Sequence, residues 1–90
     1  MEFMLNLATT DGMIGLGAGI AALGGGMAAL GAGIGVGRVG GDATQAMARQ
    51  PDKSAEIIRA MMITACLVEG VALFGAVIAL LAYTDLASKI

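Results

Sequence analysis

The fold follows from the stretch AMMITACLVEGVALFGAVIALLAYT, from Ala60 to Thr84. A helix of roughly 20 apolar residues spans the ~30 Å hydrocarbon core of a bilayer, and this stretch has 25 residues. Glu69, near its middle, is the only side chain in it that is charged at neutral pH. The stretch therefore predicts a membrane-spanning helix that carries one acid at the depth of the hydrocarbon.

Glu69 is the first candidate for a functional residue. A carboxylate at that depth is costly, so an intramembrane acid is by default a functional hypothesis. The cost falls mainly on the charged form, which favours the protonated, neutral acid. Such a group is suited to take up and release a cation. The alternative is an acid that only hydrogen-bonds a neighbouring helix, which a neutral Asn or Gln would do at lower cost.

A second apolar run, from Met13 to Gly37, precedes the first and contains no charged or hydrogen-bonding side chain. Ten of its 25 residues are glycine, and each glycine costs about 1 kcal/mol relative to alanine in an ordinary helix interior. In lipid an unpaired backbone group costs more, so a helix remains the expected state. The chain is therefore predicted to cross the membrane twice.

Most of these glycines form two stripes on opposite sides of the helix, at about 100° per residue. The first stripe is Gly17, Gly24, Gly31 and Gly35, and the second is Gly15, Gly19, Gly26, Gly33 and Gly37; only Gly25 belongs to neither. Small residues let another helix approach closely, so two stripes favour a helix with a close neighbour on each side. Identical copies in head-to-tail contact close into a ring when the rotation permits. The alternative is a bundle of unlike subunits.

Between the two runs, residues 38–59 hold four of the five basic residues. By the positive-inside tendency this connection is cytoplasmic, and both termini lie on the other side. Pro51 disfavours helix at the preceding residue. The prediction is a two-helix antiparallel transmembrane hairpin, an all-α membrane protein, with helix one at about 12–46, the turn at about 47–53 and helix two at about 54–86. Counting from the turn places Glu69 level with residues 31–37.

Composition excludes several other classes. The chain is 58% hydrophobic, with a formal charge of −2, one Cys and no His. Five basic residues are too few for a nucleic-acid surface, and a metal site made by the protein alone is not expected. No constellation of nucleophile and base, metal or phosphate loop indicates an enzyme.

Three motifs, in this order, give the chain a resemblance to a known family: GAGIGVG at Gly31 to Gly37, ARQPD at Ala48 to Asp52, and LVEG at Leu67 to Gly70. Each is weak alone, but together in a two-run hairpin of 90 residues they are specific. The chain resembles the c subunit, or proteolipid, of F-type ATP synthases over essentially its whole length.

The resemblance implies a homo-oligomeric ring of hairpins in the bacterial plasma membrane, with helix one inside and helix two outside. It implies that Glu69 binds one coupling ion per subunit and releases it at a stationary a subunit. The turn at Arg49, Gln50 and Pro51 would contact the gamma and epsilon subunits of the central stalk. Close helix packing would fall on Gly31, Gly33, Gly35 and Gly37. Such a subunit is a non-catalytic part of the complex and needs no cofactor.

The same resemblance bears on the ion. Sodium-binding relatives surround the acid with side-chain oxygens, which hard cations prefer. The corresponding positions here are Val36, Gly70, Val71 and Phe74, and none of them has a side-chain oxygen. The Glu69 carboxyl and backbone carbonyls such as that of Leu67 remain. The prediction is H⁺, with Na⁺ as the alternative.

Two functions of other classes stay open from the residues alone. A passive oligomeric pore would explain the hairpin and the glycines, but helix one offers no polar lining. A purely structural proteolipid would leave Glu69 without a role.

Overall fold

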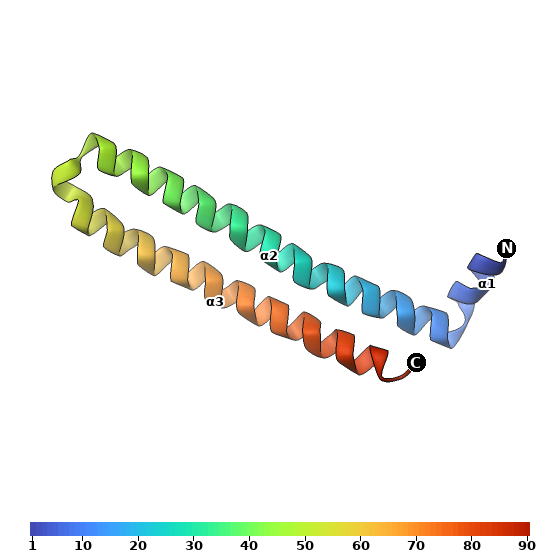
Figure 1. Cartoon of the computed structure of the whole chain (residues 1–90). Helices are drawn as coiled ribbons and strands as arrows, with labels where there is room; N and C mark the ends of the chain where they lie inside the picture. Colours follow the sequence, from blue (N-terminus) through green and yellow to red (C-terminus); the bar gives the residue numbers. More distant parts are fainter.

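The computed structural model describes the backbone of residues 1–90 and the side chains of all of them except Leu7. In chain order its elements are α1 (Glu2–Ala8), α2 (Thr10–Arg49), the 3-10 turn η1 (Pro51–Lys53) and α3 (Ser54–Ala87). Helices α2 and α3 run antiparallel, side by side, and the two chain ends lie at the end opposite the turn (Figure 1). The molecule measures 65 × 24 × 9 Å. The predicted all-α, two-helix hairpin is confirmed.

Both long helices are long and apolar enough to cross a membrane. At 1.5 Å per residue α2 is about 60 Å long, while the hydrocarbon core is about 30 Å thick. The first apolar run starts near the N-terminus and the second ends near the C-terminus. The part of each helix that exceeds the thickness of the hydrocarbon core therefore lies near the turn. At the turn end the hairpin is therefore longer than the core of a bilayer requires.

The turn is tighter than the sequence suggested. Residues 47–49, which the sequence assigned to the turn, continue α2. The helix ends at Arg49, and the capping residue Gln50 has φ −133° and ψ 73°. Pro51 forces this break, because it disfavours helix at the residue before it. It then starts η1, and the Pro51 carbonyl accepts a hydrogen bond of 2.7 Å from the Ser54 hydroxyl. At the other end α2 begins at Thr10, two residues before the predicted start.

The seam between α2 and α3 is lined by small residues. Ala18, Ala32 and Ala43 are the buried residues of α2. A Cβ placed on Gly25 would lie 3.3 Å from the Cβ of Ala79. Gly25, the one glycine outside both stripes, is therefore one that the close approach of the two helices requires.

Little else is buried by the hairpin itself. Among the described residues α3 has none that is buried. The face of α2 away from the seam carries a row of exposed apolar side chains: Leu16, Ile20, Leu23, Met27, Leu30 and Ile34. A chain with so little interior must gain its stability from the membrane and from neighbouring helices.

Candidate functional site

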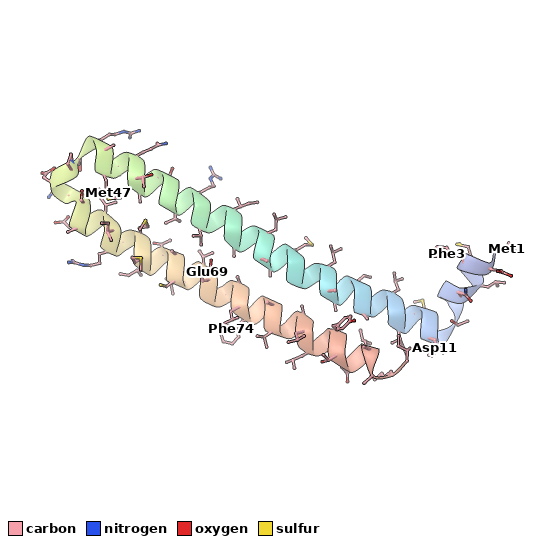
Figure 2. The ribbon with its side chains drawn as sticks, viewed as in Figure 1. Met1, Phe3, Asp11, Met47, Glu69 and Phe74 are labelled. Atoms are coloured by element: carbon pink, nitrogen blue, oxygen red, sulfur yellow. The ribbon has the colours of Figure 1, made fainter. Side chains whose placement is uncertain are left out.

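Glu69 lies on α3 in a groove on one side of the seam, about midway along the hairpin (Figure 2). The groove, of about 300 Å³, is called here the Glu69 groove. Its other lining residues are Ala29, Ala32, Gly33, Ala72, Leu73 and Ala76. Small residues from both helices therefore leave room beside the carboxyl.

The Glu69 carboxyl is chemically isolated within the hairpin. It forms no hydrogen bond or ion pair with any described residue. Among the described residues the one ion pair is far from Glu69: the Lys89 amine lies 3.3 Å from the Asp85 carboxylate at the end of α3. The other side chains around Glu69 are alanine, glycine and leucine. The groove thus offers one group that can hold a proton and no side chain to neutralise a carboxylate.

A second groove lies at the same level on the other side of the seam. It is larger, about 560 Å³, and is called here the Gly31 groove. Besides Gly31 it is lined by Met27, Ala28, Ala32, Leu67, Val68, Val71, Ala72 and Gly75. Ala32 and Ala72, which lie in the seam, line both grooves. The hairpin therefore has an acidic side and a purely apolar side at one depth.

The residues expected around Glu69 are not gathered there in one hairpin. Leu67 and Val71 line the Gly31 groove, on the other side. Val36, Gly70 and Phe74 line neither groove. Phe74 is 73% exposed and points away from α2 (Figure 2). A single chain therefore provides the acid without the surroundings that the sequence assigned to it.

The four glycines of the GAGIGVG motif divide between the two sides. Gly31 lines one groove and Gly33 the other. A Cβ added at Gly31, Gly33 or Gly37 would meet no described atom within 4 Å, and one at Gly35 would lie 3.6 Å from Val68 Cγ1. The hairpin alone therefore gives no steric reason for glycine at these positions.

Arg49, Gln50 and Pro51 are exposed at the tip of the hairpin. The backbone there is hydrogen-bonded: the Gln50 amide donates to the Ala46 carbonyl at 2.9 Å, and the Lys53 amide donates to the Gln50 carbonyl at 3.0 Å. The tip is consequently a compact, polar end of two long helices.

Sequence reasoning missed part of the α2 lining of the Glu69 groove. Counting from the turn pointed to residues 31–37, whereas the structure places Ala29, Ala32 and Gly33 there. The alanines of α2, which lie on one flank between the glycine stripes, were the available signal. They recur at the spacing of a helix seam and fix the register of the two helices.

The family comparison agrees with this geometry. The pattern of the ATP synthase C subunit family matches residues 12–82, which include the first apolar run, all but the last two residues of the second, the tip and both grooves. The chain belongs to this family of ATP synthase c subunits.

Several curated relatives are named as the c subunit of ATP synthase. One from Bacteroides thetaiotaomicron is 48% identical over 50 residues, which is 56% of this chain and 59% of the relative. One from Phocaeicola vulgatus is 52% identical over 48 residues, 53% of this chain and 57% of the relative. The chain thus spans a little over half the length of these two relatives. One from Clostridium botulinum is 44% identical over 73 residues, 81% of this chain and 87% of the relative.

No solved structure matches the chain. Family membership and two helices able to span a bilayer place this protein in a membrane.

Proposed function

We propose that the chain is a rotor-ring subunit of an F-type ATP synthase and that Glu69 is reversibly protonated as the ring turns. The observation that carries the proposal is the pair of grooves at one depth. One contains a lone carboxyl and the other is wholly apolar. This is the arrangement expected of a hairpin that presents an acid to the adjacent copy on one side and an apolar surface to the adjacent copy on the other side.

The two grooves favour a head-to-tail assembly of identical copies. A two-fold contact through the Glu69 groove would bring two carboxyls together, whereas a head-to-tail contact sets the Gly31 groove of one copy against the Glu69 groove of the next. The glycines that leave open space beside both grooves support this contact, because they permit close approach of another helix. Repetition of one such contact closes into a ring.

The ring would complete the site that one hairpin lacks. Leu67 and Val71 line the Gly31 groove, so in a head-to-tail contact they cover the Glu69 of the neighbouring copy. Such an apolar cover would separate the carboxyl from water. The surroundings expected from the sequence would then come from two copies.

The groove chemistry favours H⁺ over Na⁺ as the translocated ion. A proton needs the carboxyl alone, while a hard metal cation needs several oxygen ligands. In the Glu69 groove the carboxyl is the one side-chain group with oxygen atoms. No cofactor enters this function.

Coupling requires many copies acting in turn, because one charge moved through 100 mV is worth about 2.3 kcal/mol. In the proposal each Glu69 exchanges its proton at a stationary a subunit, and the tip at Arg49, Gln50 and Pro51 contacts the gamma and epsilon subunits of the stalk. The subunit itself is non-catalytic. The basic residues of the connection, Arg38, Arg49, Lys53 and Arg59, lie at the tip and on the adjoining ends of the two long helices, which supports a cytoplasmic loop, with both termini on the outer side of a bacterial plasma membrane.

The test is labelling of the purified oligomer with a hydrophobic carbodiimide, a reagent for protonated carboxyls in apolar surroundings. It is done across pH, in Na⁺ and in K⁺, with Glu69→Gln as the control. Labelling confined to Glu69, declining as pH rises and equal in the two salts, is the expected result. Protection by Na⁺ would overturn the assignment of H⁺, and absence of labelling at every pH would overturn the carrier role.

A further inference from the structure

Helix α1, Glu2–Ala8, was not expected from the sequence and has no part in the function proposed above. It contacts α2 and has no contact with the described residues of α3. In Figure 1 it turns away from the line of α2, on the side opposite α3. It therefore projects sideways from the hairpin instead of lengthening it.

Thr9 fixes this change of direction. Its φ of −76° and ψ of 159° are those of extended backbone. Its hydroxyl donates to the Asn6 carbonyl at 2.6 Å and accepts from the Gly12 amide at 3.0 Å. One side chain thus caps the end of α1 and the start of α2, and N-caps of this kind are worth about 0.5–2 kcal/mol. The bend is built into the hydrogen bonding of the chain.

The surface of α1 is amphipathic. At about 100° per residue, Glu2 and Asn6 fall on one narrow stripe. The rest of the circumference carries exposed apolar side chains, with Phe3 72%, Met4 67% and Leu5 61% exposed. Figure 2 shows Phe3 near the tip of α1, far from α3. No described residue of the hairpin covers this apolar surface.

The position of α1 indicates what covers it. The helix ends five residues before the apolar run that starts at Met13, and the part of α2 before this run, from Thr10, rises only about 4.5 Å. Because α2 spans the membrane, α1 lies at the level of the lipid headgroups, where the chain ends leave the bilayer. Only the short polar stretch of residues 9–12 separates its exposed apolar side chains from the exposed apolar side chains of α2, which begin at Met13.

We propose that α1 is an interfacial membrane-binding helix that lies in the plane of the lipid surface. Its apolar side sinks about 5–10 Å into the boundary between headgroups and acyl chains, the depth usual for such helices. The stripe of Glu2 and Asn6 faces water. Because the bend at Thr9 joins α1 to α2, the contact of α1 with the lipid surface fixes how deeply the hairpin sits in the bilayer. It does so at the end of the hairpin that holds the chain termini. The inference rests on the membrane location and not on the identity of the ion.

A single tryptophan tests the proposal, because the chain has none of its own. The full-length Phe3→Trp variant is reconstituted in phosphatidylcholine vesicles that contain lipid brominated either near the headgroup or near the chain end. The expected result is a blue-shifted emission and a larger loss of fluorescence with the shallow bromines than with the deep ones. The matched control is Asn6→Trp, on the polar stripe, which should emit as in water and lose little fluorescence with either lipid.

Four results would overturn the proposal. Water-like emission of Phe3→Trp would put α1 in solution. Blue-shifted emission without quenching by either lipid would mean that neighbouring copies cover the helix. Stronger quenching by the deep bromines would mean that α1 continues the membrane span, and equal quenching of both variants would remove the proposed orientation.

Discussion

The two sides of the α2–α3 seam are similar in form but differ in charge. Both grooves lie at the same depth, share Ala32 and Ala72 and are lined by small residues from both helices. One contains Glu69, and the other has only apolar side chains and glycine. This contrast indicates that the two sides of the hairpin contact different surfaces. Each copy would supply the acid of one site and the apolar cover of the next site.

The largest effect is expected from removing the charge that distinguishes the grooves. Glu69→Gln keeps the shape of the side chain but cannot exchange a proton, so proton-driven ATP synthesis by the reconstituted complex should fall to background. The ring should still assemble, because the amide is neutral like the protonated acid. Glu56→Gln, an exposed carboxyl beyond the apolar run, is the matched control and should retain activity. Substantial synthesis by Glu69→Gln would remove the acid from the mechanism.

The next effect is expected from filling a groove. Gly31→Leu should prevent ring assembly while leaving the hairpin folded, because a Cβ there meets no described atom of the hairpin. Overpacking of this kind costs about 1–3 kcal/mol at each contact, and a ring repeats the contact. The measurement is the oligomer fraction in mild detergent beside the helix content by circular dichroism.

Two controls make the groove-filling experiment specific. Gly25→Leu, within the seam, should damage the hairpin as well as the ring, because its added Cβ already lies 3.3 Å from Ala79. Gly41→Leu, beyond the apolar run and also without a neighbour within 4 Å, should change neither. Normal rings from Gly31→Leu would mean that the Gly31 groove faces lipid.

An intermediate effect is expected from giving the site oxygen ligands. The double variant Val36→Gln, Gly70→Ser adds oxygen atoms at two positions where the sequence predicts that sodium-binding relatives have them. Na⁺ should then slow carbodiimide labelling of Glu69 in the variant but not in the parent, because a hard cation needs several oxygens. Equal protection of parent and variant would show that oxygens already present suffice for Na⁺.

The smallest effect is expected from thinning the apolar cover. Val71→Ala removes two methyl groups from the Gly31 groove, which should lower ring stability by about 1 kcal/mol per contact. Thermal dissociation of the ring should shift slightly, while the helix content of the separated chain stays the same. Val77→Ala removes the same atoms at a position that lines neither groove, and it should have no effect on the ring.

The sequence was sufficient for the hairpin because its signals are local. The two apolar runs, Pro51 and the basic connection each act within a few residues of where they stand. The position of Glu69 about midway along the hairpin followed from counting along one helix. The antiparallel pairing followed from the tightness of the connection.

What the sequence could not provide depends on how two helices are rotated against each other. The glycine stripes were expected to form the close contacts, but the seam within the hairpin mainly uses alanines, Gly25 and Gly75. Of the stripe glycines, Gly17 approaches α3 most closely, with an added Cβ 3.2 Å from Leu86 Cδ1. Leu67 and Val71, only two residues from Glu69, lie on the other side of the seam, since two residues turn a helix by about 200°. Helix α1 was not predicted because its 7 residues make only about two helical turns, too few for a periodic pattern to stand out in the sequence, and because the signal was the cap at Thr9.

The head-to-tail contact can be tested by cross-linking the two sides of the seam. The variant Val71→Cys, Leu73→Cys, with Cys66→Ala to remove the native thiol, places one thiol in the Gly31 groove and one in the Glu69 groove. A short bifunctional thiol reagent applied to the membrane-embedded protein should give a ladder of oligomers that ends at the complete ring, while each single-cysteine variant should stay monomeric on a denaturing gel. Dimers from a single-cysteine variant, with no ladder of oligomers from the double-cysteine variant, would show a two-fold contact between copies. That result would contradict the head-to-tail ring.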